Sequence, residues 1–182
     1  MIYVLGGAPR SGKTLLARRA VVEKQIPYLP TDALVSGLMA APQLGINYDQ
    51  PFIERSVTMW PITKALLKCL LEEERDYLVE GDSFIPSQAA ELQAEGKPVK
   101  ACFVGYTQLS SEQKLALVRE HHQGEIDWTR GLPDEELQPM IDRMIEFSSY
   151  LEEESTKVGI KYFDISHNFH NSRQEAFSYL FE

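Results

Sequence analysis

The sequence predicts a three-layer α/β/α domain built on a parallel sheet of five strands. Short apolar segments that suit buried strands alternate with longer segments that suit helices, which is typical of a parallel sheet covered on both faces. The 182 residues are enough for one such domain with its own core. A glycine-rich turn joins the first strand to the first helix. We therefore expect a ligand site beyond the carboxyl ends of the strands.

The expected elements follow from apolar runs, helical periodicity and turn residues. The strands are Ile2–Leu5, Pro27–Leu29, Tyr77–Glu80, Val99–Val104 and Ile160–Ile165. The helices are Lys13–Lys24, Ala33–Met39, Phe52–Glu74, Pro86–Gln93, Ser110–His122, Asp134–Lys157 and Ser172–Leu180. Pro61 is expected to break the third helix in two. The chain is predicted to be a single domain over residues 1–182, with a substrate-binding insertion at about 33–60 and a lid at about 110–143 that contains an irregular segment, Gly124–Pro133.

The glycine-rich turn carries the most specific motif in the chain. Its residues Gly7, Ala8, Pro9, Arg10, Ser11, Gly12, Lys13 and Thr14 match G-x-x-x-x-G-K-[ST], the phosphate-binding P-loop. In such a loop backbone N–H groups and a helix N-terminus face a polyphosphate. We expect Lys13 to reach the β- and γ-phosphates and the Thr14 hydroxyl to bind Mg²⁺. The sequence therefore predicts that this chain binds a nucleoside triphosphate.

Acidic residues follow the second and third strands. Asp32 lies where it could accept the proton of an attacking hydroxyl, although it could also cap the helix that starts at Ala33. Glu80 and Asp82 end an apolar strand, an arrangement in which one acid supports Mg²⁺, directly or through water. Solvated acids at an exposed strand end are the alternative. The sequence leaves open which of the two would support the metal.

Further candidate residues lie in the insertions and in the last loop. Arg55 is expected near the substrate, and Arg119, Arg130 and Arg143 flank the expected lid, where one or two could bind the transferring phosphoryl group. Each of these arginines, taken singly, also suits a solvated surface. Asn168 could contact the nucleotide base and Phe169 could pack on it, although turn chemistry explains the same residues.

Charge and hydropathy limit the partners. The net charge of −9 disfavours nucleic acid or an anionic membrane as the main partner, because both require a basic surface. No apolar run reaches the length of a membrane span, and no charged leader precedes the first strand. We expect a cytoplasmic protein that acts on a small molecule. Its oligomeric state is left open.

With these residues, the chain resembles the nucleoside-monophosphate-kinase-like group of P-loop kinases. This group includes adenylate, shikimate and gluconate kinases, chloramphenicol phosphotransferase and 2-phosphoglycerate kinase-like proteins. The matching stretches are Gly7–Thr14, Asp32, Leu78–Gly81, the run from Arg130 to Arg143 with Tyr150, and Asp164–Phe169. The resemblance implies ATP, Mg²⁺ and a sheet order of 2-3-1-4-5. Two departures from adenylate kinases stand out: Gly81 is followed by Asp82-Ser83-Phe84 in place of a D-G-x-P-R signature, and the lid has no zinc cysteines.

These features together predict an ATP-dependent kinase that phosphorylates a hydroxyl of a small metabolite. In this prediction Lys13, Asp32, Arg130 and Arg143 are catalytic. The alternatives are a nucleoside monophosphate kinase, a regulatory nucleotide-binding ATPase and a toxin-like kinase. An Asp32→Asn change should be mild if the acceptor is itself a phosphate, because a phosphate needs no general base.

Overall fold

The computed structural model describes residues 1–121 and 127–182. Its strands are β1 (Ile2–Gly7), β2 (Tyr28–Pro30), β3 (Tyr77–Gly81), β4 (Val99–Gly105) and β5 (Lys161–Asp164). Its α-helices are α1 (Lys13–Lys24), α2 (Thr31–Leu38), α3 (Phe52–Glu72), α4 (Pro86–Ala94), α5 (Ser111–Glu120), α6 (Asp134–Val158) and α7 (Phe169–Phe181). A short 3-10 helix, Pro42–Leu44, lies between α2 and α3.

The five strands form one parallel sheet in the order β2-β3-β1-β4-β5. This confirms the predicted architecture and the sheet order that the resemblance implied. Since β1 is central, the loop that follows it emerges between the carboxyl ends of β3 and β4. β2 and β5, the shortest strands, form the two edges.

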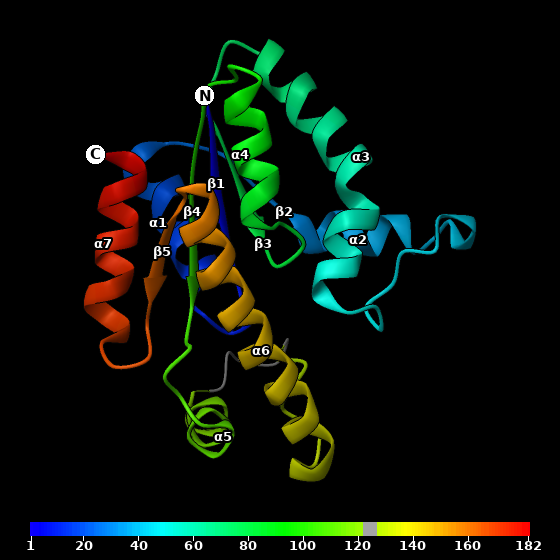
Figure 1. The fold of residues 1–182 in the computed structure, drawn as a ribbon, viewed down its shortest axis with the longest axis vertical. Helices are drawn as coiled ribbons and strands as arrows, with labels where there is room; N and C mark the ends of the chain where they lie inside the picture. Colours follow the sequence, from blue (N-terminus) through cyan, green and yellow to red (C-terminus); the bar gives the residue numbers. More distant parts are fainter. Residues whose placement is uncertain (122–126) are drawn as a thin grey trace.

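Alternating side chains of the strands support two separate cores. Ile2 and Val4 of β1 pack in the larger core with residues of α3, α4 and α6, whereas Leu5 packs in a second core with residues of α1 and α7. Figure 1 shows α1 and α7 on one side of the sheet and α4 and α6 on the other. It also shows α5 and the beginning of α6 beyond the carboxyl ends of β4 and β5. Among the described helices, none combines the length and apolar character needed to span a bilayer.

The prediction that Pro61 divides the third helix was wrong. α3 continues from Phe52 to Glu72 with Pro61 inside it. Proline removes the hydrogen bond to the carbonyl of Val57, and both residues are exposed. Water can therefore solvate the carbonyl that proline leaves unbonded, while the apolar face of α3 keeps its packing.

Gly81 at the end of β3 controls how closely the start of α2 approaches the sheet. A Cβ atom built on Gly81 would lie 1.7 Å from Oγ1 of Thr31, and the backbone φ of Gly81 is +157°. Only a residue without a side chain permits this contact. Gly81 therefore sets the position of Thr31 and of its neighbour Asp32.

We expect Gly81→Ala to lower the free energy of unfolding by about 1–3 kcal/mol, because the added methyl group forces Thr31 away. Gly37→Ala in α2 is the matched control, since no atom lies within 4 Å of its built Cβ. Alanine there should stabilise the chain by about 0.5–1 kcal/mol. Urea unfolding of both variants measures the difference, and equal effects would contradict the packing argument.

Candidate active site

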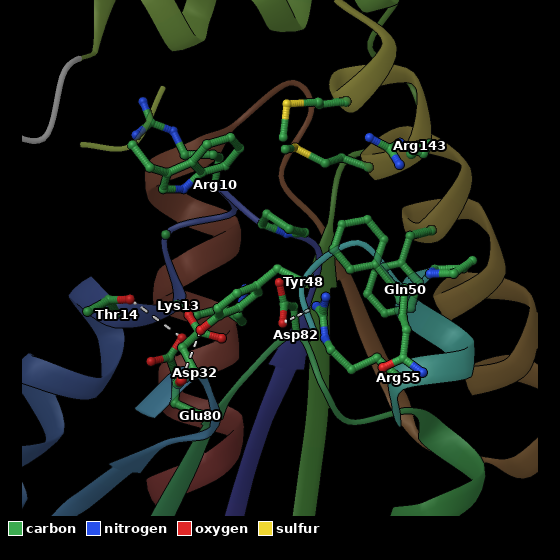
Figure 2. Close-up of a pocket in the computed structure, with 18 of the residues that line it drawn as sticks. Arg10, Lys13, Thr14, Asp32, Tyr48, Gln50, Arg55, Glu80, Asp82 and Arg143 are labelled. Carbon is green, nitrogen blue, oxygen red and sulfur yellow. Dashed lines mark hydrogen bonds and ion pairs between the residues drawn. The ribbon is translucent and has the colours of Figure 1, made fainter. Parts of the chain in front are cut away.

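A cavity of about 920 Å³ opens at the carboxyl ends of the central strands. Its lining combines the P-loop, the start of α2, the end of β3, the beginning of α3 and the first half of α6. Figure 2 shows Lys13, Thr14, Asp32 and Glu80 gathered on one side of it, with Gln50 and Arg55 on the other. Most of the predicted site residues therefore share one cavity.

The P-loop wraps the N-terminus of α1, as the motif predicts. Gly12 caps this helix in a left-handed conformation, with φ of 83°. Lys13 is only 6% exposed, and its Nζ donates to the carbonyl oxygen of Ala8 at 2.8 Å. Ser11 is fully buried, and its hydroxyl has no hydrogen-bond partner among the described residues. This loop therefore offers a cation, a helix N-terminus and an orphaned hydroxyl to an anion.

The carboxyl groups of Glu80 and Asp32 lie close enough to Lys13 to interact with its charge. Desolvation is the main cause that raises the pKa of Glu80, and the charge of Lys13 opposes it. Desolvation inside the cavity and the neighbouring Asp82 raise the pKa of Asp32 to about 6, against the opposing charges of Lys13 and Arg55. Asp32 is exposed towards the cavity, whereas Glu80 is 5% exposed. Asp32 is thus a carboxylate that can exchange a proton near neutral pH.

Asp82 is committed to an ion pair. Arg55, 1% exposed, donates from Nη2 to Oδ1 of Asp82 at 2.9 Å and from Nε to Oγ of Ser83 at 3.1 Å. Breaking such a buried pair would leave an uncompensated charge. Asp82 and Arg55 therefore fix the floor of the cavity together.

The donor set suits Mg²⁺ held mainly through phosphates. Oγ1 of Thr14 donates to Oε1 of Glu80 at 3.5 Å, so a hydroxyl and an acid meet beside Lys13. In the described part of the chain, no group of three or more His, Cys, Asp or Glu residues could hold a metal. Mg²⁺ usually binds one or two carboxylates together with phosphate oxygens and water, so Thr14 and Glu80 fit this requirement.

Helix α2 begins at Thr31 after Pro30, two residues earlier than an Asp32 cap would require. Pro30 occupies the N-cap position, and no side chain caps this end. The interpretation of Asp32 as an N-cap was therefore wrong. Its carboxylate lies in the first helical turn, where it interacts favourably with the helix dipole. The side chain is left to face the cavity.

The P-loop is tied to the segment around α5. Arg10 has a positive φ of 61°, and its Nη1 forms an ion pair with Oδ2 of Asp127 at 2.7 Å. Nζ of Lys114 donates to the carbonyl oxygen of Arg10 at 3.0 Å and lies 3.5 Å from the ring centroid of Tyr106. The Tyr106 hydroxyl donates to the carbonyl oxygen of Pro9 at 2.5 Å. These contacts hold residues 9 and 10 in the loop conformation.

Lys114 makes stability depend on pH in a predictable direction. Burial, together with the charges of Arg10 and Lys13, lowers the pKa of Lys114 to about 7. Above pH 7 the unfolded chain keeps a proton on this lysine that the folded chain has lost. The free energy of unfolding should therefore gain up to ~1.4 kcal/mol per pH unit between pH 7 and 10 from this group.

We expect Lys114→Met to show a smaller gain in unfolding free energy than the wild type between pH 7 and 9. Urea unfolding at both pH values measures this gain. Lys97→Met, at an exposed position, is the control and should keep the wild-type gain. A full gain in Lys114→Met would contradict the burial argument.

The lid arginines differ in position. Arg143 of α6 lines the cavity with its side chain exposed, whereas Arg130 is exposed and is not part of the lining. Arg119 donates to Asp134 and to the carbonyl oxygens of Thr129 and Leu132, so it holds the turn before α6. Of the predicted lid, residues 122–126 lie outside the described residues, and they include the end of the predicted helix Ser110–His122 and the beginning of the irregular segment Gly124–Pro133.

Asn168 and Phe169 lie at the N-terminus of α7. Asn168 caps this helix, with Oδ1 accepting from the backbone N of Asn171 at 3.3 Å, and it does not line the cavity. Phe169 is 45% exposed and lies beside Gly12, whose built Cβ would approach its ring to 2.9 Å. Of the two, the structure brings Phe169 against the P-loop.

Sequence reasoning missed the apolar side of the cavity. Tyr48, Phe52, Met140, Met144 and Phe147 all line it. The apolar spacing along α6 was visible, but the same spacing occurs on any helix face that packs in a core. Trp128 also lines the cavity and is 49% exposed.

Solved structures with a similar fold include a gluconokinase and shikimate kinases. A gluconokinase from Sinorhizobium meliloti 1021 superposes with a TM-score of 0.59 at 19% identity, covering 98% of this chain and 90% of the other. A shikimate kinase from Bacteroides thetaiotaomicron gives 0.56 at 15% identity, covering 98% and 97%. A shikimate kinase from Acinetobacter baumannii in complex with shikimate gives 0.56 at 17%, covering 97% and 89%.

No family model and no curated protein matches the sequence. The likeness is thus one of fold over nearly the whole chain, and it agrees with the sheet order and the loop described above. The chain has the three-layer α/β/α fold of the P-loop kinases.

Proposed function

We propose that this protein is an ATP-dependent kinase that transfers the γ-phosphoryl group to a hydroxyl of a small molecule. One observation carries the proposal: Asp32 lies in the same cavity as Lys13 of the P-loop. A carboxylate beside the phosphate site is what an alcohol acceptor requires and a phosphate acceptor does not. The kinases with a similar fold support this assignment at the level of reaction class.

In the proposed reaction the acceptor oxygen forms a bond to the γ-phosphorus while the bond from that phosphorus to the bridging oxygen breaks. The acceptor proton passes to Asp32, and ADP leaves with the electron pair of the broken bond. Lys13 stabilises the charge on the phosphates, and Arg143 approaches the transferring group from α6. Arg130 has no place in this scheme, since it lies outside the cavity lining.

Thr14 and Glu80 are the residues that would hold Mg²⁺, which supplies charge neutralisation on the phosphates when bound. In this proposal Asp82 supports Arg55, with which its Oδ1 forms an ion pair, and Glu80 supports the metal. Arg55 would act on the acceptor site indirectly, because its ion pair holds Asp82 in position. This division of roles between the two acids is part of the proposal.

The proposal is tested by incubating the protein with ATP, Mg²⁺ and a mixed metabolite extract. Mass spectrometry should detect ATP loss together with new masses that exceed a parent alcohol by one phosphoryl group. Lys13→Ala protein in the same extract is the control and should give none. ATP loss that is equally fast without the extract, with no phosphorylated product, would favour a regulatory ATPase instead.

A further inference from the structure

The acceptor half of the cavity is built from rings and thioether side chains. The rings of Phe52 and Phe147 are stacked, with centroids 4.8 Å apart and planes at 19°. Met140 and Met144 add to the same wall from α6, and Ile53 adds to it from the first turn of α3. Figure 2 shows Gln50 and Arg55, which flank Phe52 and Ile53 in the sequence, across the cavity from Lys13 and Glu80.

Several polar groups of the cavity lining beside this wall are already used within the protein. The Tyr48 hydroxyl contacts Oγ of Ser36 and donates to the backbone oxygen of Asp32 at 3.0 Å. Gln50 accepts from the backbone N of Asn47 and donates to Glu54. Arg55 is bound to Asp82 and Ser83, as described above. A ligand therefore meets the ring of Tyr48 more readily than its hydroxyl.

The apolar side chains of the wall differ in exposure, since Phe147 and Met144 are 3% and 2% exposed, whereas Phe52 and Met140 are partly exposed. Tyr48 is 47% exposed and Ile53 is 38% exposed, and both open into the cavity. Of the polar side chains on α6, only Arg143 and Glu146 line the cavity within the described residues, and both are exposed. A polyhydroxylated acceptor would leave several hydroxyls without partners here, which is costly in a desolvated site.

From this wall we infer that the acceptor is an alcohol with a flat apolar body, such as an aromatic ring, and not a sugar acid or another polyol. Its ring would lie against the exposed apolar faces of Tyr48 and Ile53, beside Phe52 and Met140, and its hydroxyl would point to Asp32. The inference rests on the proposed function, because it names the acceptor of that same site. It predicts a preference that a matched pair of alcohols can measure.

The probes are 1-phenyl-1,2-ethanediol and glycerol. Both carry a vicinal diol, and they differ in a phenyl group against a hydroxymethyl group. Calorimetric titration of the full chain with each, in the presence of a non-hydrolysable ATP analogue, gives the two affinities. We expect the phenyl diol to bind at least ~10-fold more tightly, because burial of one aromatic ring supplies about that factor or more. Equal or weaker binding of the phenyl diol would overturn the inference.

Ile53→Thr tests whether this wall is responsible. It should weaken binding of the phenyl diol about three- to tenfold, because the phenyl group loses apolar contact. Glycerol has no such group, so its binding should be unchanged. Val57→Thr is the matched control: Val57 is 57% exposed one turn further along α3 and does not line the cavity. It should change neither affinity. An Ile53→Thr variant that binds both diols as the wild type does would also overturn the inference.

A transfer assay separates this inference from the proposed function. Phosphorylation of the phenyl diol in preference to glycerol supports both. Phosphorylation of glycerol alone overturns the acceptor class and leaves the kinase standing. Tight binding of the phenyl diol with no transfer to any alcohol, from this pair or from the metabolite extract, overturns the proposed function.

Discussion

Replacing Lys13 by alanine is expected to lower phosphoryl transfer by on the order of 10³-fold or more, the largest effect of any single change considered. Lys13 lines the cavity, its charge acts on Glu80, and the residue is 6% exposed, so its ammonium group acts where water screens little. Charge that develops on the phosphates during transfer would lose its closest cation. The fold should persist, because the side chain makes one hydrogen bond, to Ala8, worth about 1 kcal/mol.

Single-turnover transfer from ATP measures this loss, and circular dichroism checks that the variant is folded. Lys24→Ala is a suitable control, since Lys24 lies on the same helix at its exposed C-terminal end. It should retain wild-type turnover. A folded Lys13→Ala variant with unchanged turnover would remove the assignment of a phosphate-binding loop.

Replacing Asp32 by asparagine is expected to lower turnover of an alcohol acceptor by about 10²–10⁴-fold, the range of general-base catalysis. Asparagine has nearly the size of aspartate and keeps its position in the first turn of α2, but it has no carboxylate to accept the proton. ATP affinity should change little, because the P-loop is untouched. Stability should change by a few tenths of a kcal/mol at most from the helix dipole, since Pro30 and not Asp32 is the N-cap.

The pH dependence of turnover is an independent test of the role of Asp32. Its pKa of about 6 means that the carboxylate gains a proton as pH falls through 6, and a protonated carboxyl cannot act as the base. Wild-type turnover should therefore decrease below pH 6, whereas the residual turnover of Asp32→Asn should not show this decrease. Asp49→Asn, in the exposed loop before α3, should behave as the wild type. Near-normal turnover of Asp32→Asn would indicate a phosphate acceptor, as in nucleoside monophosphate kinases.

The sequence could predict the parts of this protein that depend on local patterns. Gly12, Lys13 and Thr14 stand at fixed spacing between a strand and a helix, so the loop conformation follows from neighbouring residues. The apolar strands likewise follow from their own composition. The order of the strands needed the family resemblance, because nothing within a strand tells which neighbour it pairs with.

Contacts between segments far apart in the chain could not be predicted from the sequence. Arg55 was expected near the substrate, but its burial against Asp82 depends on how α3 meets the end of β3. The continuous helix through Pro61 depends on which face of α3 is exposed. The sequence allowed Asn168 either to contact the nucleotide base or to serve in a turn, and in the structure it is the N-cap of α7.

The two edges of the sheet bear on how copies of this chain meet one another. β2 has three residues and ends in Pro30, which has no backbone N–H, and β5 has four residues with charged Lys161 and Asp164 at its ends. Short edges with proline or charge offer few unpaired backbone groups to a foreign strand. Edge-to-edge pairing, the usual start of β-aggregation, therefore finds little template on either side of this sheet.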